Sequence, residues 1–240
     1  MLYLADYISQ TMKFKYPFLL VAISLCFVTK SFSQKGNYDI INGVGIFGGV
    51  TSIDLTTDNF ITTTGNGFIG GLSSTVEISH KWYNMSFGLH LLESAIKISA
   101  RPTMLGASNP EEFIDYKFFA TQMALMMHVK LAGSYVTLDV GPMLQYNGKL
   151  ELKDRNKENY FINNYNNLMA SDITNISNFN INGAVGVTAG FKFIKLRAHY
   201  IYGFTNVLKK LNSENLDTSG GISNFKGNTT MLVFGGMISF

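Results

Sequence analysis

Six ionisable residues stand out, because each lies in a segment where apolar residues alternate with small or polar ones. They are Glu77, His128, Asp139, Lys195, Arg197 and His199. Carboxylates, imidazoles and basic groups can transfer protons, bind ions or form buried ion pairs. Which of these applies depends on the elements that carry the six residues.

The histidines narrow the catalytic possibilities. His80 lies at an expected short turn, whereas His90, His128 and His199 lie on strand faces. A hydrolase site needs a histidine that a carboxylate orients near a nucleophile, and the long connections contain no histidine. We therefore interpret the loop carboxylates as solvated surface. No phosphate-binding loop, metal-ligand spacing or nucleophile motif is found, so the sequence predicts no catalytic residue, no metal and no cofactor.

Strands are the expected elements, because no segment after residue 34 shows helical periodicity. A period-2 alternation of unlike faces recurs eight times. In the last segment Phe240, Ile238 and Phe234 share one face, and Ser239 and Gly235 lie on the other. The segments are 40–53, 68–79, 83–91, 116–130, 136–146, 179–193, 194–205 and 228–240.

The connections between these segments alternate in length. Short ones fall near 80–84, 131–134 and 193–195, and long polar ones near 54–66, 99–114, 153–178 and 208–226. Short turns at one end and long loops at the other are typical of outer-membrane barrels. The sequence predicts an all-β fold, an eight-stranded antiparallel up-and-down transmembrane β-barrel over residues 34–240.

A soluble sandwich or lipocalin-like barrel is the alternative, with its apolar face turned inward. Charged residues are only 15% of the chain, against about 25% in soluble domains. The polar strand faces carry mostly Gly, Ser, Thr, Ala and Asn, which suit the narrow interior of eight strands. These features favour the membrane barrel. The net charge of +3 is small and unclustered, and it gives no case for nucleic-acid binding.

Aromatic residues of the apolar faces gather at the strand ends, as in interfacial girdles. One predicted girdle, at the short-turn rim, consists of Trp82, Tyr83, Tyr135, Phe193 and Phe240. At the opposite rim we expect Phe68, Tyr146, Phe179, Tyr202 and Phe204.

The six ionisable residues then point into the lumen near the short-turn rim. Charges in so narrow a space should be paired, because an unpaired buried charge is strongly unfavourable. We interpret the cluster as a structural plug and expect Asp139 or Glu77 to contact Arg197 or Lys195. A proton or ion path is the alternative.

The N-terminal residues resemble an export signal. Lys13 and Lys15 precede an apolar stretch from Pro17 to Val28, and a small-residue site ends at Ser33. We expect residues 1–33 to be a leader, with Met12 as the start and cleavage after Ser33. The only cysteine, Cys26, lies within it, so we expect no disulfide in the mature chain.

Several segments in order resemble the PorT-like outer-membrane β-barrel family of Gram-negative bacteria. They include "GVGIFGGVTS", "FIGGLSSTVEISHKWYNMSFGLHLL", "YVTLDVGPMLQY" and "INGAVGVTAGFKFIKLRAHYIYGFTNVL". The similarity covers residues 37–240, although "QMALMM" stands where the family often has an "IPLL"-like run. The resemblance implies an integral outer-membrane barrel. Some members of the family are linked to protein secretion.

The predicted function is non-catalytic: structural support, surface binding or assistance to secretion through the long loops. Tyr160, Phe161 and Tyr165 in the Asn-rich loop suit adaptable binding contacts, or they pack over the barrel mouth. Expected partners are outer-membrane lipid, the barrel-assembly machinery through the last strand, and secretion components or an extracellular ligand. A narrow channel is the second candidate and an outer-membrane enzyme the third.

Overall fold

A computed structural model describes residues 40–78, 80–102, 111–191 and 193–240. The chain divides into two units, of which one consists of residues 40–77 and 83–240 and contains the barrel. The other consists of residues 1–39 and 78–82. In its described part Lys81 N–H donates to the Ile78 carbonyl over 3.1 Å. The predicted leader lies outside the described residues.

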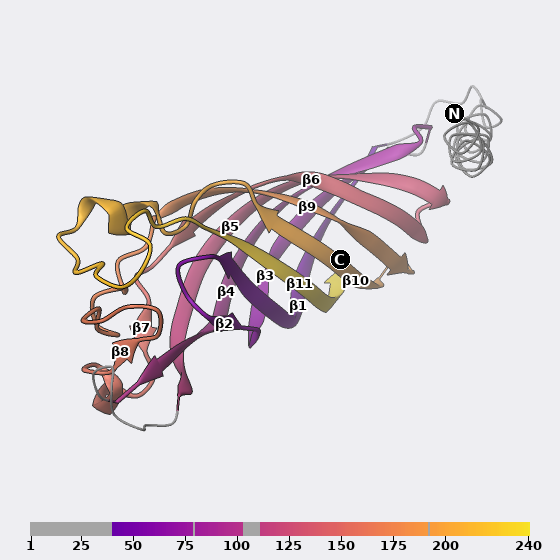
Figure 1. The fold of residues 1–240 in the computed structure, drawn as a ribbon. Helices are drawn as coiled ribbons and strands as arrows, with labels where there is room; N and C mark the ends of the chain where they lie inside the picture. Colours follow the sequence, from indigo (N-terminus) through magenta and orange to yellow (C-terminus); the bar gives the residue numbers. More distant parts are fainter. Residues whose placement is uncertain (1–39, 79, 103–110, 192) are drawn as a thin grey trace, which may run out of the picture. The chain divides into compact units, whose positions relative to one another are not determined.

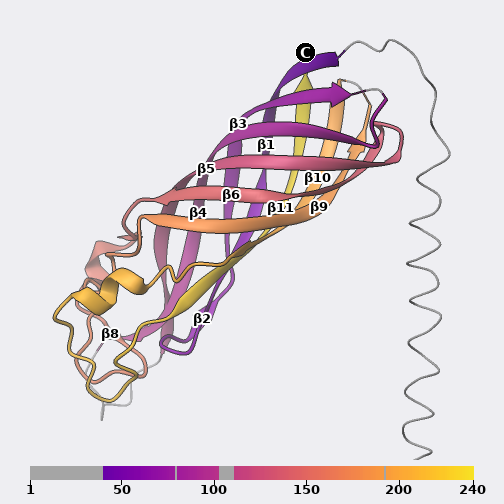
Figure 2. The same ribbon diagram turned by 90° about the horizontal axis from the view of Figure 1, so that it is seen from above.

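Eight strands form a closed ring, as the sequence predicts. Their order around the ring is β1, β11, β10, β9, β6, β5, β4 and β3, and β3 pairs again with β1 (Figure 2). Their bounds are β1 (Ile40–Thr57), β3 (Gly65–Ile78), β4 (Tyr83–Arg101), β5 (Glu112–Ala132), β6 (Val136–Asn147), β9 (Phe179–Gly190), β10 (Ile194–Gly203) and β11 (Gly227–Ser239).

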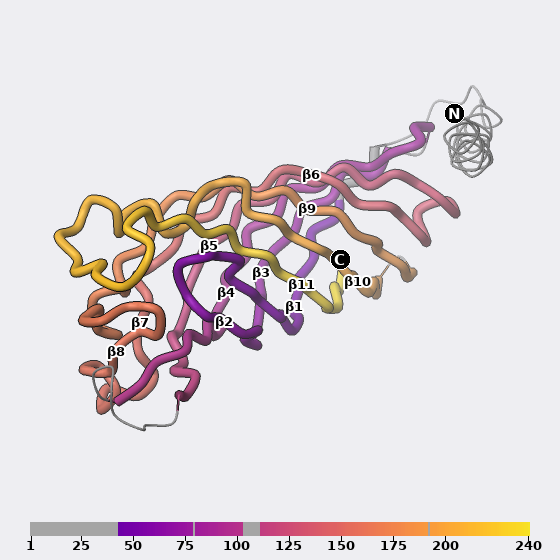
Figure 3. The backbone as a smooth tube through the Cα atoms, in the orientation of Figure 1, coloured from indigo at the N-terminus to yellow at the C-terminus, as the bar shows by residue number. Residues whose placement is uncertain are grey.

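Antiparallel pairing of the first and last strands closes the ring. The register runs from Gly45 opposite Ser239 to Thr57 opposite Gly227. Figure 3 lets the chain be followed up and down through the hairpins. In the turn between β5 and β6, Gly133 has a φ of 56° and Tyr135 N–H donates to the Ala132 carbonyl. A side chain at position 133 would be strained in that conformation.

The outward strand faces form an apolar belt. Leu89 and Leu91 of β4, Leu125 of β5, and Leu196 of β10 are each between 46% and 67% exposed. A water-soluble protein does not leave a contiguous apolar band of this extent uncovered. Because lipid offers no hydrogen bonds, a sheet that spans it must close on itself, and this ring does. The chain is an eight-stranded transmembrane β-barrel.

Charged residues return to the outward face at the level of the outer aromatic residues. Phe68 lies opposite Glu93, and Glu93 lies opposite Phe119. Glu93 and Lys117 form an ion pair of 3.1 Å, with side chains 57% and 39% exposed. The apolar belt therefore ends at the level of Phe68 and Phe119.

Two strands run well beyond this level, which the sequence did not predict. β4 continues to Arg101 and β5 begins at Glu112, whereas the alternation suggested a loop from 99 to 114. Short elements pair with these extensions: β2 (Thr62–Thr63) and β8 (Phe161–Ile162) with β4, and β7 (Glu151–Leu152) with β5. Alternation fails there because consecutive residues of β4, such as Ile98, Ser99 and Ala100, are all buried.

The long connections thus build a folded region at one end of the barrel, opposite the C-terminus (Figure 1). We call residues 58–64, 95–102, 111–118, 148–178 and 204–226 the cap. It includes the 3₁₀ turns η1 (Arg155–Lys157) and η2 (Lys209–Ser213). Among the described residues, no helix is long and apolar enough to cross a membrane.

Leu125 is the outward residue halfway between Phe119 and Leu131 on β5, so it tests the lipid contact. We predict that Leu125→Arg lowers the free energy of unfolding by about 2–4 kcal/mol, because it places a cation near the bilayer midplane. Leu131→Arg, at the short-turn end, should cost only about 0–1 kcal/mol. Unfolding in guanidinium from lipid bilayers measures both. Equal costs for the two variants would contradict a lipid-facing belt.

Candidate functional site

The lumen is the first candidate site, because it holds the polar residues that the sequence singled out. Asp139 of β6 lies in it near the short-turn rim and is fully buried. Oδ1 of Asp139 accepts from His128 Nδ1 over 2.6 Å and from the Thr137 hydroxyl over 2.7 Å. Oδ2 accepts from His199 Nε2 over 2.8 Å and from the Thr188 hydroxyl. Four donors therefore satisfy one buried carboxylate.

Strand register explains why these groups meet. His128 lies directly opposite Asp139 across the β5–β6 pair. Across β9, Gly186 lies opposite both Asp139 and His199. A β-carbon on Gly186 would lie 2.5 Å from Cδ2 of the His199 ring. The missing side chain at 186 thus lets His199 reach over β9 to Asp139.

The predicted ion pair is replaced by this histidine arrangement. In the described part of the chain, no ion pair within 4.0 Å joins Asp139 or Glu77 to Arg197 or Lys195, so that expectation was wrong. Arg197 lies opposite Thr188, whose hydroxyl donates to Asp139. The guanidinium of Arg197 lies 5.6 Å from the centre of the Phe47 ring. Glu77 instead accepts from the Ser134 hydroxyl.

Ser86 extends the cluster into a serine–histidine–aspartate series that the sequence analysis missed. Its Oγ lies 2.7 Å from Nε2 of His128. An ionised Asp139 can only accept, so His128 donates from Nδ1, and a neutral ring then accepts the Ser86 proton at Nε2. The order matches a hydrolytic triad. However, Ser86 is only 4% exposed, whereas acyl transfer needs space for a carbonyl beside the nucleophile.

The lumen next to this series is nearly filled. His128, Thr188, Lys195 and Arg197 help to line a cavity of about 10 Å³, which is about the space of one water molecule. Among the described residues no group of three or more acidic, histidine or cysteine side chains is arranged to hold a metal ion. The geometry is that of a packed polar core.

A second polar layer lies nearer the cap. Gln122 donates to Gln145 over 2.7 Å, and Asn182 donates to the same oxygen over 2.8 Å. Gln145 in turn donates to Asn147, which donates to the Ser177 carbonyl in the cap. Their positions on inward faces could have identified these amides, although the sequence did not indicate that they bond to one another.

The expected girdle residues differ in exposure. Tyr135, Phe193 and Phe240 are between 62% and 79% exposed, at the strand ends near the short turns. Tyr83, at the start of β4, is half-buried. Trp82 belongs to the other unit and is 53% exposed.

At the opposite strand ends the aromatic residues pair edge-on. Tyr146 contacts Phe179 with ring centres 5.0 Å apart, and Tyr202 contacts Phe204 at 5.4 Å.

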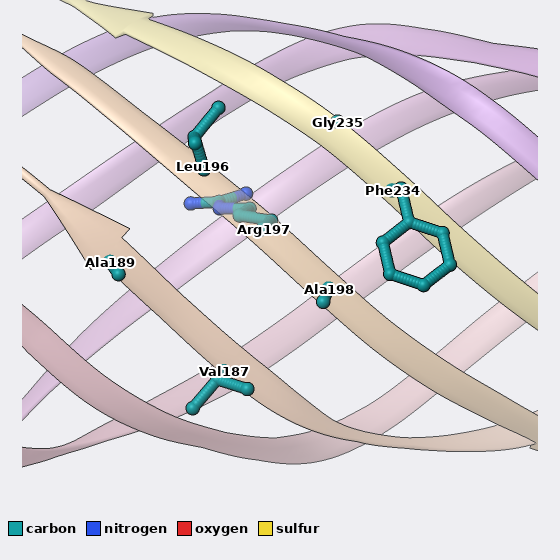
Figure 4. Close-up of a pocket in the computed structure, with 7 residues that line it drawn as sticks. All are labelled: Val187, Ala189, Leu196, Arg197, Ala198, Phe234 and Gly235. Carbon is teal, nitrogen blue, oxygen red and sulfur yellow. The ribbon is translucent and has the colours of Figure 1, made fainter.

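A lipid-facing depression of about 460 Å³ crosses β9, β10 and β11 (Figure 4). Small Ala189 and Ala198 lie in it, beside the larger Val187, Leu196 and Phe234. Arg197 also lines it but is only 6% exposed. Its apolar lining suits the acyl chains of surrounding lipid.

The cap is the second candidate site, and it has an apolar core of its own. Tyr165 is fully buried and stacks on Phe225 with ring centres 6.0 Å apart. Its hydroxyl donates to the Ile222 carbonyl and accepts from Asn59. Of the two interpretations of the aromatic loop, packing therefore applies to Tyr165. Tyr160 and Phe161 remain partly exposed.

Arg101 ties the Asn-rich loop to the end of β4. Its guanidinium donates to the carbonyls of Ile162 and Tyr165 and to Oδ1 of Asn163, over 2.5–3.2 Å. Burial lowers the pKa of Arg101 from its ordinary value, but arginine remains charged at any physiological pH. The loop is consequently a fixed structure on a rigid strand end.

The comparisons with known proteins concern the fold. No protein-family model matches the chain, and no curated protein matches it. Solved structures of outer-membrane proteins are similar. Neisserial surface protein A (NspA) has a TM-score of 0.44 and 11% identity, over 85% of this chain and 100% of that one.

Two further structures match to a similar degree. Ail, the attachment invasion locus protein of Yersinia pestis, was crystallised with the heparin analogue sucrose octasulfate; it has a TM-score of 0.42 and 12% identity, over 83% and 99% of the two chains. The outer-membrane protein OprG from Pseudomonas aeruginosa has a TM-score of 0.43 and 9% identity, over 84% of this chain and 97% of that one. The assignment to transmembrane barrels rests on this chain's own strand pairing and apolar belt.

Asp139 is the residue on which we expect the lumen to depend most. Asp139→Ala leaves two histidines and two threonines without their acceptor, so we predict a loss of about 3–5 kcal/mol in the free energy of unfolding. Thr137→Val removes only one donor and should cost about 1 kcal/mol. Guanidinium unfolding of the refolded barrel measures both. Similar small losses would show that the cluster contributes little.

Titration of the Asp217 carboxyl group tests whether the loops of the cap are held together as the structure shows. Hydrogen bonds from Ser219, first, and from Asn167 lower the pKa of Asp217 from 3.8 to about 2. A lowered pKa means that the carboxylate stabilises this contact above about pH 4 and loses that effect as the pH falls towards 2. NMR titration of the carboxyl carbon should give a midpoint near 2. A midpoint near 4 would mean that Asp217 accepts from neither Ser219 nor Asn167, so that it does not join its own loop to the Asn-rich loop.

Proposed function

We propose that this protein is an integral barrel of a bacterial outer membrane, with a closed lumen and a non-catalytic role carried by its cap. The observation that carries the proposal is the contrast between a filled lumen and a folded, exposed cap. The lumen is filled by hydrogen-bonded side chains around Asp139, and the cap is folded around buried Tyr165. Surface binding or support of other envelope components uses a rigid exposed surface of this kind.

The filled lumen favours a closed barrel and argues against the second candidate, a narrow channel. A conducting path needs continuous water, and the cavity beside Arg197 holds about 10 Å³. The imidazoles of His128 and His199 and the hydroxyls of Thr137 and Thr188 already donate to Asp139, so the carboxylate is saturated without an ion. Eight-stranded barrels in general have interiors that side chains can fill.

Burial of Ser86 supports a non-catalytic role. The series of Ser86, His128 and Asp139 has the distances of a triad, but its nucleophile lies inside the packed lumen. Two carboxylates at the cap surface are engaged in ion pairs, Asp115 with Lys153 at 3.6 Å and Glu112 with Lys157 at 2.9 Å. Neither arrangement offers a base beside a free nucleophile.

The resemblance of several segments to the PorT-like family extends the proposal to assistance in protein secretion. The proposed partners are outer-membrane lipid around the apolar belt, the barrel-assembly machinery through β11, and secretion components or an extracellular ligand at the cap.

Conductance in planar bilayers tests the closed lumen. We predict that the purified barrel gives no stepwise current, because the layer of described side chains around Asp139 leaves room for about one water molecule. The matched variant replaces His128, Arg197 and His199 together with alanine, which empties the lumen and should produce steps. Gel migration before and after boiling checks that the variant is folded. Steps from the unchanged protein would overturn the closed lumen and favour the channel.

Labelling of intact cells tests the outward position of the cap. Asn215→Cys lies on the cap and Ala132→Cys at the short-turn end of β5, and both positions are exposed. A membrane-impermeant maleimide should label position 215 and spare position 132. The reverse pattern would place the cap on the periplasmic side and overturn the proposed role.

A further inference from the structure

A polar pocket lies on the side of the cap, beside the extension of β5 beyond the apolar belt. Its walls come from Phe113 and Asp115 of β5, Leu152 of β7, and Lys153, Asp154 and Lys157 in and around η1. Its volume is about 240 Å³. Pairing of Tyr116 with Leu152, and the bond from Lys153 N–H to the Asp115 carbonyl over 3.0 Å, fix the two walls.

The lining joins one aromatic surface with two ion pairs, whose charges balance, and with Asp154, whose carboxylate accepts from Asn156 N–H over 3.1 Å. Phe113 is 46% exposed. Lys153 lies 3.6 Å from Asp115, and Lys157 lies 2.9 Å from Glu112. All four of these side chains are between 26% and 51% exposed. They can therefore donate to or accept from a ligand while they stay paired with each other.

This balance decides which class of ligand fits. A lone anion would have to compete with Asp115 and Glu112 for the lysines, and a lone cation would compete with the lysines for the carboxylates. A neutral polyhydroxylated ring meets no such competition. Its hydroxyls both donate and accept, and its apolar face can cover an exposed aromatic ring.

We propose that this pocket binds a single neutral sugar ring, such as a hexose unit of a surface glycan. Its volume is below the roughly 300–1,000 Å³ of pockets for drug-sized ligands, and it suits one ring. Phe113 stacks on the sugar face, Asp115 accepts from its hydroxyls, and Lys153 donates to them. The proposal rests on the outward position of the cap proposed above.

The test uses the full mature chain in nanodiscs of phosphatidylcholine alone, because detergents with sugar headgroups would occupy the pocket. Saturation-transfer NMR with the methyl glycosides of glucose, galactose and mannose should show transfer to the ring protons of at least one. A site of this size should bind with a dissociation constant on the order of 1 mM. Phe113→Ala and Asp115→Asn should each weaken binding at least tenfold.

Two variants elsewhere on the cap serve as matched controls. Ile222→Ala removes another exposed apolar side chain, and Lys209→Ala another exposed lysine; neither should change binding. Altered gel migration on boiling confirms that every variant is folded. Absence of transfer from all three glycosides, or undiminished binding by Phe113→Ala, would overturn the proposal. Binding of phosphoethanolamine in place of the glycosides would overturn it in favour of a zwitterion.

A second arm distinguishes the sources of the sugar. A hexosyl lipid in the same nanodisc that lowers the glycoside signal would identify a neighbouring lipid headgroup as the ligand. An unchanged signal would assign the pocket to glycans of other molecules. Labelling at position 215 from outside the cell, together with absence of glycoside binding, would refute the sugar pocket and leave the proposed function of the cap standing.

Discussion

Hydrogen bonding between the first and last strands of the ring is the constraint on which the rest of the structure depends. In hydrocarbon every backbone N–H and C=O must find a partner within the protein. The pairing of β1 with β11, from Gly45 opposite Ser239 to Thr57 opposite Gly227, removes the last free edge. Once the ring is closed, alternate residues must face lipid and lumen, and eight strands leave a lumen that is only as wide as its side chains.

That narrow lumen explains the arrangement around Asp139. A carboxylate with no access to water must be satisfied by donors from neighbouring strands. His128 reaches it directly across one strand pair, and His199 reaches it only because Gly186 has no side chain. The same packing leaves Ser86 without room for a substrate. The series of Ser86, His128 and Asp139 thus lies in the packed interior of the barrel.

The cap meets a different requirement, since water surrounds it. Its loops could remain loose there, yet Arg101 and Tyr165 bind the Asn-rich loop to the extension of β4. Exposed groups are then held at fixed positions, as in the pocket between Phe113 and Lys153. Function on this protein is therefore expected where rigid backbone meets water, above the apolar belt.

The sequence by itself determined the eight strands, their outward and inward faces and the ring, because period-2 alternation and loop lengths are local properties of the chain. It also indicated that Asp139, His128 and His199 face inward. Only the tertiary structure decided their partners: which side chains meet across a barrel depends on strand register and on a gap such as Gly186. Likewise, the burial of Tyr165 and the length of β4 depend on contacts between loops far apart in the sequence, and no local pattern records those contacts.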